Sequence, residues 1–481
     1  MINRRSLLKA LGAGATLTVA GGSIVGCTNR PVGEDRDPNV VRMWGIWASD
    51  ADKEAKIIEA FTEQNPDIKV QLSQVPSNGQ GDASSVITAV RGRTGPDLYF
   101  MDRFNGAQFA SLGLLEPINS LIEEYEKVDP EEFMSGWVKF ATDELFYDGE
   151  WFGLPMDTDT RAMYYNKDLA EEAQIDPKLL DPANGPMSYD QIWEINDAFN
   201  VTDKRGTYER VTWIPWDDQA SLLMWAIAQG ATFFDNDTCE MTLNSPEMLG
   251  VAEMYADWVE KLNYPRLDAF KATYQPPNAP PTQTSFFSNR QLFQISGPWG
   301  VGSQAEYKPD MRYGVTHLPV PNEGDRPFTW AGGFAVAMPK GSSMSEAAWK
   351  LLKFYAGYEG QKILMPQISR IPTNIECIKD PEGWNADIRF FVEIMEYAQS
   401  RPPLPVGTKL WDAMFSMQGS LNQRSKTPQE AVDEAQRYVN PTMKGFCPIK
   451  LPEGFGEPDP NFEIADEEEQ KEAQASDGGA G

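Results

Sequence analysis

Histidine is almost absent from this chain, with a single residue among 481. Imidazole is the commonest metal ligand and a frequent general base, so this shortage excludes most histidine-dependent catalysis and most transition-metal sites. The one histidine, His317, lies in the strand-like run YGVTHLPV. A structural role is therefore favoured for it, and we expect neither a metal site nor a cofactor.

Cysteine is also scarce, with four residues: Cys27, Cys239, Cys377 and Cys447. No pair of them has the spacing of a zinc site or of a redox dithiol. Cys27 belongs to a targeting segment described below, so an odd number remains in the folded part. A disulfide is permitted outside the cytoplasm, but at least one thiol must stay unpaired, and the sequence does not say which cysteines pair.

Basic residues are few relative to acidic ones: 42 Lys and Arg stand against 71 Asp and Glu, for a formal net charge of −29. Binding to phosphate backbones needs concentrated Lys and Arg, so nucleic acid is excluded as a partner. The acidity indicates a soluble protein and fits a saline habitat, but it does not identify a ligand.

Long hydrophobic runs are missing as well. The apolar stretch ALGAGATLTVAGGSIVG is shorter than the ~20 residues that a membrane-spanning helix needs. It follows Arg4 and Arg5, which form a twin-arginine export pattern, and it ends in IVGC, which resembles a bacterial lipobox with Cys27 as the lipidated residue. An uncleaved membrane anchor is the alternative.

This targeting segment predicts the location of the protein. We expect a signal peptide over residues 1–27 and a polar tether over 28–38. The protein would leave the cytoplasm by the twin-arginine pathway and stay attached to the cell membrane by a lipid on Cys27, in the periplasm or on the cell surface.

What the chain does have is an alternation of strand and helix patterns. Its 481 residues suggest more than one domain. Near the start, strand patterns alternate with helix patterns. The expected strands are 40–44, 68–72 and 97–101, and the helices that follow them are 49–65, 82–92 and 104–111. This order is typical of a mainly parallel sheet with helices on both faces. Ligands of such sheets bind beyond the carboxyl ends of the strands, here at the loops WGIWASD and FMDRFNG.

A second αβ region begins near residue 155. Ser245 and Pro246 mark the start of a helix, and Thr427 with Glu430 predicts a capping box at the start of another. Further helices are expected at 345–357 and 387–399, with strands at 291–299 and 332–339. Residues 451–481 are acidic and rich in Gly and Ala, which predicts a disordered tail.

Tryptophan is abundant, with 14 residues, and several are predicted to lie in loops beside Asp, Ser, Thr and Gly. An indole can stack on the apolar C–H face of a sugar while carboxylates bind its hydroxyls, so this pattern favours a carbohydrate ligand. Trp258 and Trp349 are expected in the core. The loop tryptophans are Trp44, Trp47, Trp213, Trp216, Trp299 in GPWG and Trp330.

Several motifs, in this order, resemble one known family. They are DRF followed by SLGLLEPI, GLPMDTDTRAMYYNKDL, FFSNRQLFQISGPW followed by YGVTHLPVP, and WAGGFAVAMPKGSSMSEAAWKLLKF. They resemble the maltose- and maltodextrin-type extracellular solute-binding proteins (family 1) of ABC importers, over residues 40–450 approximately.

The resemblance implies a type II periplasmic-binding-protein fold. Each of two lobes would be a mainly parallel sheet flanked by helices, and the lobes would close over a sugar by a hinge. The implied lobes are 39–153 plus 296–334 and 154–295 plus 335–450, with crossings near 153–158, 295 and 335. Such a protein is not an enzyme and would act as a monomer. Its partners would be a carbohydrate ligand, the permease subunits of an ABC importer, and the membrane through the lipid on Cys27.

The resemblance also implies the sugar contacts. Three positions depart from the maltose-specific pattern: Ser49 replaces a lysine, Tyr99 a tryptophan, and Asp159 a longer Glu, which puts maltose itself in doubt. The implied ligand-binding residues are Trp47, Ser49, Tyr99, Asp102, Arg103, Asp159, Trp216, Asp218, Trp299, Trp330, Gly332, Gly333, Arg370 and Trp411. Trp299 would project from a strand end, and its flanking glycines would let the ligand approach.

Other functions remain open at this point. A secreted glycoside hydrolase would use two carboxylates, with Asp157 and Asp159 or Asp217 and Asp218 as candidates. The same fold could bind glycerol phosphate, a peptide or a metal; a phosphate would need arginines such as Arg103, Arg161 and Arg370. A purely structural surface lipoprotein would leave the loop aromatics unexplained.

Overall fold

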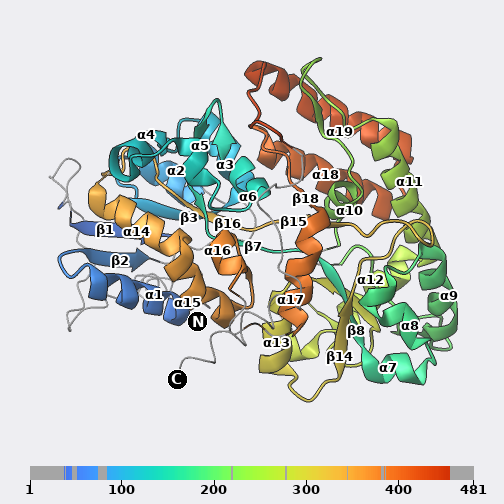
Figure 1. Ribbon diagram of the computed structural model, residues 1–481. Coiled ribbons are helices and arrows are strands. Elements are labelled where there is room, and N and C mark those ends of the chain that lie inside the picture. Colours follow the sequence, from blue (N-terminus) through green and yellow to red (C-terminus); the bar gives the residue numbers. More distant parts are fainter. Residues whose placement is uncertain are drawn as a thin grey trace, which may run out of the picture.

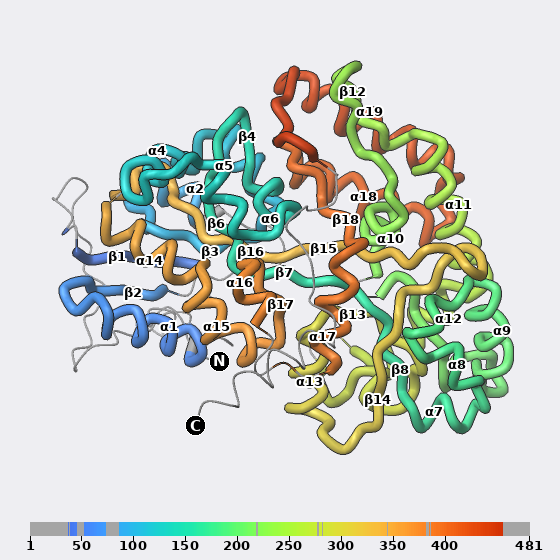
Figure 2. Tube along the Cα trace, in the orientation of Figure 1, coloured from blue at the N-terminus to red at the C-terminus, as the bar shows by residue number. Residues whose placement is uncertain are grey.

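The computed structural model describes residues 37, 39–45, 51–73, 84–217, 220–276, 279–343, 345–380, 384 and 386–455. Two lobes lie side by side and are joined by segments that pass between them (Figures 1 and 2). Several predictions fall outside the described residues: the signal peptide with Cys27, Trp47, Ser49, Asp218 and nearly all of the tail. None of the helices in the described ranges has both the length and the hydropathy of a membrane-spanning segment.

The first lobe is built on a five-stranded sheet with the order β2-β1-β3-β16-β6. β1 lies between β2 and β3 and is parallel to both, as predicted, whereas β16 runs antiparallel between β3 and β6. The strands are β1 (Val40–Trp44), β2 (Lys69–Ser73), β3 (Leu98–Asp102), β6 (Leu154–Pro155) and β16 (Phe334–Ala337).

Alternate residues of these strands serve two separate cores, because neighbours along a strand point to opposite faces. Met43 and Phe100 pack on one face with Trp349, under the helices α1, α14 and α15 that Figure 1 shows together over the strands. Met101 and Ala335 point to the other face, where α2 and α3 cover them. The helices are α1 (Ala51–Gln64), α2 (Ser84–Arg91), α3 (Gly106–Ser111), α14 (Glu346–Ala356) and α15 (Tyr358–Ile368).

Short elements complete this lobe and lead toward its partner. They are η3 (Arg103–Asn105), α4 (Asn119–Leu121), η4 (Ile122–Glu126), α5 (Pro130–Met134), α6 (Lys139–Asp143), β4 (Phe146–Tyr147) and β5 (Glu150–Trp151).

The second lobe has a three-stranded sheet with the order β13-β8-β14. β8 (Ala162–Asn166) is antiparallel to both β13 (Phe293–Ser296) and β14 (Tyr313–Thr316). The prediction of a mainly parallel sheet is therefore wrong for this lobe. The reason is that β8 runs away from the crossing segment, whereas both of its neighbours end beside its first residues, with Ser296 opposite Ala162.

Helices surround this smaller sheet, and the predicted helix starts are confirmed. Ser245 caps α11, and Thr427 with Glu430 forms the capping box of α19. The helices are α7 (Lys167–Glu172), α8 (Pro177–Leu180), α9 (Tyr189–Phe199), α10 (Leu222–Ala228), α11 (Pro246–Lys261), α12 (Tyr264–Tyr274), α13 (Trp299–Tyr307), α17 (Ala386–Glu393), α18 (Gly407–Asn422) and α19 (Pro428–Met443).

A tryptophan cluster forms the core of the second lobe. The ring of Trp258 lies 5.0 Å from that of Trp225 and 5.2 Å from that of Trp213. Trp258 and Trp349 are each 1% exposed, which confirms their predicted core placement. Trp213 is different: the sequence groups it with the loop tryptophans, but it is only 2% exposed because the edges of the other indoles enclose it.

The structure corrects the predicted lobe boundaries. β14 lies within the predicted first-lobe segment 296–334 but pairs with β8 in the second lobe. β16, α14 and α15 lie within the predicted second-lobe segment 335–450 but belong to the first-lobe sheet and its core. Strand pairing decides which lobe a segment belongs to, and β16 pairs with β3 and β6 in the first-lobe sheet.

Within the described residues, three segments cross between the lobes. The first runs through β7 (Asp157–Thr158), close to the predicted crossing, and pairs with β17 (Ile371–Pro372) in the third. The second contains β15 (Thr329–Ala331), which pairs with β18 (Ala398–Ser400). An isolated bridge joins Asp159 to Gly332 and ties the first crossing to the second. The predicted crossing near 295 lies instead at this second segment, because β13 stays within the second lobe.

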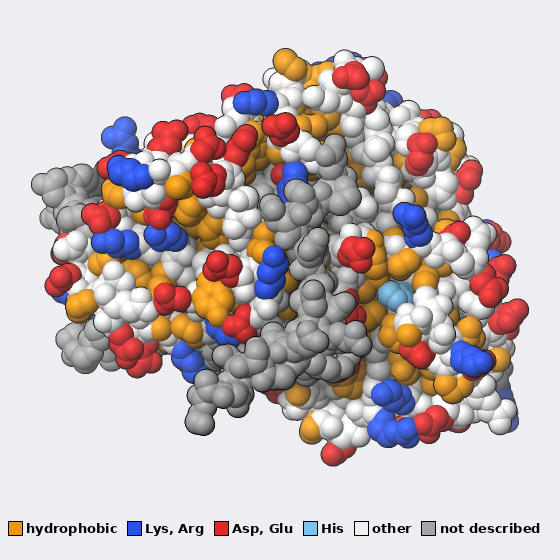
Figure 3. Space-filling view, viewed as in Figure 1, with side chains coloured by type: hydrophobic (Ala, Val, Ile, Leu, Met, Phe, Trp, Pro, Cys, Tyr) orange, Lys and Arg blue, Asp and Glu red, His pale blue; other side chains and the backbone are white. Residues whose placement is uncertain are grey.

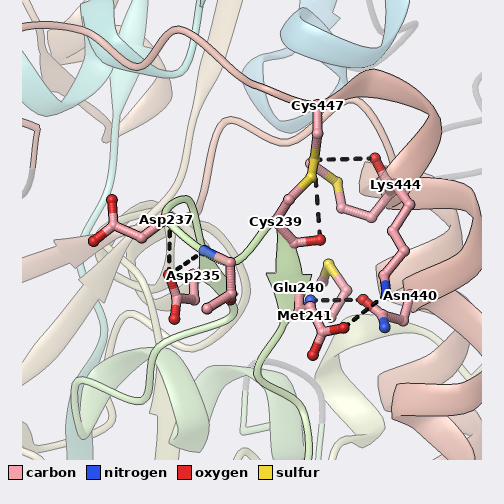
Figure 4. The surroundings of a disulfide bond; sticks show 10 residues. Asp235, Asp237, Cys239, Glu240, Met241, Asn440, Lys444 and Cys447 are labelled. Carbon is pink, nitrogen blue, oxygen red and sulfur yellow. Dashed lines mark hydrogen bonds and ion pairs between the residues drawn. A yellow bond between two sulfur atoms is a disulfide. The ribbon is translucent and has the colours of Figure 1, made fainter.

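One disulfide, between Cys239 and Cys447, joins segments 208 residues apart in the sequence (Figure 4). Cys239 precedes β12 (Glu240–Met241), which forms a hairpin with β11 (Phe234–Asp235). Cys447 follows α19 and η8 (Lys444–Phe446). The remaining thiol in the described residues, Cys377, is buried and unpaired, and burial raises its pKa to about 12.

His317 has a structural setting, as the sequence predicts. It follows β14, its Nε2 lies 3.1 Å from the Pro182 carbonyl oxygen, and its Nδ1 lies 2.7 Å from the Tyr397 hydroxyl. The ring of Phe390 packs against it at 5.2 Å. Burial lowers the pKa of His317, which the bond to the Pro182 carbonyl offsets only in part.

This lowered pKa predicts a pH-dependent contribution to stability. The unfolded chain binds the proton more readily than the folded chain, so the contribution is complete above the unfolded pKa of ~6.5 and is lost as the pH falls below it. Between pH 7 and pH 5, we expect the wild type to lose more free energy of unfolding than His317→Gln. Urea unfolding of both proteins at each pH measures this, and parallel losses would contradict it.

Candidate functional site

The candidate site begins at the carboxyl end of β3, where the first lobe meets the second. Asp102 ends the strand and accepts the Phe104 backbone N–H at 2.9 Å, which caps η3. Its carboxylate also pairs with the Arg401 guanidinium at 2.7 Å. The side chain of Asp102 is 17% exposed, so a predicted ligand contact lies at the lobe boundary with part of its surface accessible.

Arg103, the next residue, is fully enclosed. It donates to Glu144 at 2.9 Å and to the Gly332 carbonyl at 2.7 Å, and it also donates to the Asp157 carbonyl. These bonds connect the loop after β3 to two crossing segments. Arg103 is 0% exposed, so this predicted contact supports the site from within.

Eight charged side chains form an arginine–carboxylate network between the lobes. Glu144 accepts from Arg103 and also from Arg401, at 3.0 and 3.1 Å. Arg370 pairs with Asp157, and Arg161 pairs with Asp159. The network therefore has balanced charge, with these members: Arg103, Arg161, Arg370, Arg401, Asp102, Glu144, Asp157 and Asp159.

The two aspartates of the first crossing differ in electrostatic environment. Burial raises the pKa of Asp157, and the charge of Arg370 offsets only part of this effect. Burial would also raise the pKa of Asp159, but Arg161, Arg401 and Arg103 outweigh it and lower that pKa. Asp157 is 0% exposed, accepts the Phe334 N–H at 2.7 Å and pairs with Arg370, so its carboxylate is engaged in contacts within the protein.

Trp299 lies at this boundary because of the strand register. β13 ends opposite the first residue of β8, so the start of α13 falls beside Arg161, whose guanidinium carbon is 4.7 Å from the indole centroid. The ring is half-buried. Its flanking glycines have a packing role: a Cβ on Gly297 would meet the Trp299 ring, and one on Gly300 would meet Tyr164. The role of these glycines in ligand approach stays a prediction.

Trp330, Gly332 and Gly333 lie on the second crossing. Trp330 is buried, with Arg161 at 4.7 Å from its ring centroid. Gly332 donates its N–H to Asp159 at 3.0 Å. Gly333 has a φ of +138°, and a Cβ there would meet Arg103 and the Asp157 carbonyl, so only glycine fits this position. Arg370 lies beside these residues and pairs with Asp157 of the first crossing.

An aromatic row extends from this centre along α18. Phe104 lies 6.0 Å from Trp411, and Trp411 stacks on Phe415 at 4.9 Å. Trp411 is half-buried and Phe415 is 42% exposed. Because Phe104 belongs to the first lobe and Trp411 to the second, this row spans the boundary.

Two predicted contacts pack against the hydrophobic cores of their lobes. Tyr99 packs at the edge of the first-lobe core against Gly45, after β1. Trp216 is buried in the second lobe, with its ring 6.0 Å from that of Tyr255 and 5.6 Å from that of Tyr264. Trp216 is thus placed in a core. No group of His, Cys, Asp and Glu in the described part of the chain could hold a metal ion.

Sequence reasoning missed Glu144, Arg401 and Phe415. Glu144 and Arg401 are 257 residues apart, and no local pattern marks either as a partner. Phe415 had a usable signal, since it lies one helical turn after Trp411 and shares its face.

Comparison with known proteins settles the family. Residues 56–392 match the family described as bacterial extracellular solute-binding protein. The chain belongs to this family. Among curated relatives, this solute-binding protein is 25% identical over 416 residues to the maltotriose-binding protein of Pyrococcus abyssi, covering 83% of this chain and 82% of the relative. It is 25% identical to a maltooligosaccharide ABC transporter solute-binding lipoprotein of Streptococcus pneumoniae, over 62% of this chain and 66% of that one.

Solved structures share the two-lobed fold of this solute-binding protein. CpMnBP1 with mannotriose bound superposes with a TM-score of 0.71 at 19% identity, covering 83% of this chain and 100% of that one. The sugar-binding protein MalE of Xanthomonas citri gives a TM-score of 0.65 at 22% identity, covering 84% and 98%. The predicted family and the two-lobed α/β fold are confirmed. Both of these curated relatives are named as solute- or sugar-binding proteins, not as enzymes.

Proposed function

We propose that this protein captures a di- or oligosaccharide between its lobes and delivers it to an ABC importer. One observation carries the proposal: side chains suited to a sugar converge on the lobe boundary from both lobes. Asp102 and Phe104 come from the first lobe, and Trp299 and Trp411 from the second. The relatives named for maltotriose and maltooligosaccharides support the same class of ligand.

Each of these groups would have a distinct role in the proposed site. The half-buried indoles of Trp299 and Trp411 would stack on apolar sugar faces, and Asp102 would accept hydroxyl hydrogens. Trp47, Ser49 and Asp218 stay proposed contacts and lie outside the described residues. Arg103, Asp159, Trp330, Gly332, Gly333 and Arg370 would hold these contacts in place.

Binding to both lobes would select the closed arrangement, since a ligand shifts an equilibrium only by its differential affinity for the two states. A disaccharide of roughly 23 heavy atoms, at ~0.3 kcal/mol per atom, gives about −7 kcal/mol and a Kd in the micromolar range. Such an affinity suits capture followed by release to a permease.

Replacing Trp299 with Ala should weaken binding of the preferred sugar by about tenfold or more, because the stacking surface is lost. Isothermal titration with a maltooligosaccharide series measures the loss. Trp193→Ala is the matched control, since Trp193 is a half-buried indole of the second lobe that also lies near a cation, Lys261, at 5.0 Å. Unchanged affinity in Trp299→Ala, with a large loss of stability, would make Trp299 a core residue.

We also propose that the protein is exported by the twin-arginine pathway and anchored by a lipid on Cys27. The motif IVGC supports this, as does the lipoprotein relative from Streptococcus pneumoniae. Replacing Cys27 with Ser should move the protein from the membrane fraction to the soluble fraction, whereas Cys377→Ser should not. Retention of the Cys27 variant on the membrane would indicate an uncleaved helix.

A further inference from the structure

Arg161 lies between two indole rings at the lobe boundary. Its guanidinium carbon is 4.7 Å from the centroid of Trp299 and 4.7 Å from that of Trp330. A cation at this distance is attracted to the electron-rich face of an indole, most strongly where water is excluded. Arg161 is 4% exposed, so both contacts are largely dry.

The three residues of this stack come from three different segments. Arg161 immediately precedes β8, Trp330 lies on β15 in the second crossing, and Trp299 begins α13. The backbone of Arg161 is fixed to the second crossing twice: its N–H donates to Thr329 Oγ1 at 2.9 Å, and that hydroxyl donates to the Arg161 carbonyl at 2.7 Å. The stack therefore joins two crossing segments to the second lobe.

The guanidinium itself is held in place by Asp159. This carboxylate pairs with Arg161 and accepts the Gly332 N–H at 3.0 Å. The ion pair fixes the position of the guanidinium between the two rings. A lysine would keep the charge but not the planar shape.

The stack has different consequences for its two indoles. Trp330 is enclosed, with Arg401 as a second cation 5.8 Å from its centroid. Trp299 has Arg161 over its ring and Gly297 against its edge, yet it stays half-buried. The orientation of its accessible part therefore depends on Arg161.

We propose that Arg161 is a positioning residue that holds the Trp299 indole in the orientation that receives the sugar and links this orientation to the crossing segments. The inference deepens the proposed function and rests on it for the identity of the ligand. Asp159, which the family resemblance presents as a sugar contact, acts in this account as the anchor of Arg161.

The test compares Arg161→Met and Arg161→Lys with the matched control Arg210→Met. Arg210 lies 4.2 Å from the Phe199 ring centroid in the second lobe, so its loss removes a similar contact away from the stack. The full chain is labelled with 5-fluorotryptophan. The resonances of Trp299, Trp330 and Trp349 are assigned by their disappearance in the variants Trp299→Phe, Trp330→Phe and Trp349→Phe. Fluorine spectra are recorded without sugar, and Kd values are measured for the maltooligosaccharide that the wild type prefers.

We expect Arg161→Met to shift the resonances of both indoles and to weaken sugar binding by about tenfold, the equivalent of ~1.4 kcal/mol. Arg161→Lys should give intermediate resonance shifts and an intermediate Kd, because lysine keeps the positive charge but lacks the planar guanidinium. Arg210→Met should match the wild type in both measurements. The resonance of Trp349, in the first-lobe core, should not move in any of these variants.

The inference is overturned if Arg161→Met leaves the Trp299 resonance in place, or if it moves that resonance while the Kd stays within about twofold of wild type. The proposed function fails in a different way, when the wild type binds no sugar at all. The fluorine spectra still decide the positioning role in that case, since they need no ligand. If Arg161→Met does not fold, the spectrum and Kd of Arg161→Lys decide it.

Discussion

Replacing Glu144 with Gln should lower the free energy of unfolding by about 3–5 kcal/mol. Glu144 is 1% exposed, and its two oxygens accept from Arg103 at 2.9 Å and from Arg401 at 3.0 and 3.1 Å. The carboxylates raise the pKa of Arg401 against the opposing effect of burial, so this guanidinium keeps its charge in the folded protein. Without Glu144, two buried cations would lose their shared partner.

Urea unfolding of the wild type and of Glu144→Gln measures this difference in the free energy of unfolding. Glu260→Gln is the matched control, because Glu260 pairs with Arg424 at 3.1 Å while both side chains are more than half exposed. An exposed pair contributes about 0–1 kcal/mol, so this variant should stay close to wild type. A loss of less than about 1 kcal/mol in Glu144→Gln would show that the network does not stabilise the arrangement between the lobes.

The paired replacement Cys239→Ser with Cys447→Ser should lower the free energy of unfolding by about 2–5 kcal/mol. The disulfide closes a loop of 208 residues, so its removal gives the unfolded chain many more conformations. The folded state should change little. The hairpin stays attached to α19, because Met241 N–H donates to Asn440 at 2.8 Å and Glu240 pairs with Lys444 at 2.7 Å (Figure 4).

Reduction of the wild type should give the same loss as the double replacement. Cys377→Ser provides the comparison, since it removes a buried thiol without opening a loop. If the double variant were as stable as wild type, or if reduction changed nothing, the disulfide would not constrain the unfolded chain.

Local patterns of the sequence predicted the elements well. The strand at 40–44 is reproduced by β1, and the predicted capping box at Thr427 is present in α19. Both depend on short-range chemistry: alternation of apolar residues in a strand, and capping of free N–H groups at a helix start. The acidic surface was also predictable, and Figure 3 shows acidic side chains spread over both lobes on the face in view.

Pairing between distant segments was not predictable in the same way. The sequence contains strand patterns near 293–296 and 334–337, but nothing in either one says that the first joins β8 and the second joins β3. For this reason the predicted lobe boundaries near residues 296 and 335 are wrong. Trp213 and Trp216 do lie outside helices and strands, as predicted, but both are buried. The same limit explains why their burial was not predicted, since the aromatic rings that enclose them come from helices distant in the sequence.

The candidate site shows both sides of this limit. Trp299, Asp102 and Trp411 were found from motifs, and the structure brings them to one boundary. Glu144 and Arg401, which pair with the residues around the site, lie at positions that no local sequence pattern marks. They matter because a buried charge needs a partner, and that partner can come from any part of the chain.

The central claim is that the lobe boundary binds a sugar, and calorimetric titration of the purified protein tests it most directly. Maltose, maltotriose, longer maltooligosaccharides, mannooligosaccharides and glycerol phosphate are titrated in turn against the wild type and Trp299→Ala. The account predicts one saturable site for at least one of the sugars, with a Kd near micromolar, and clear weakening in the variant. Saturable binding of glycerol phosphate alone, or cleavage of a sugar during the titration, would contradict it.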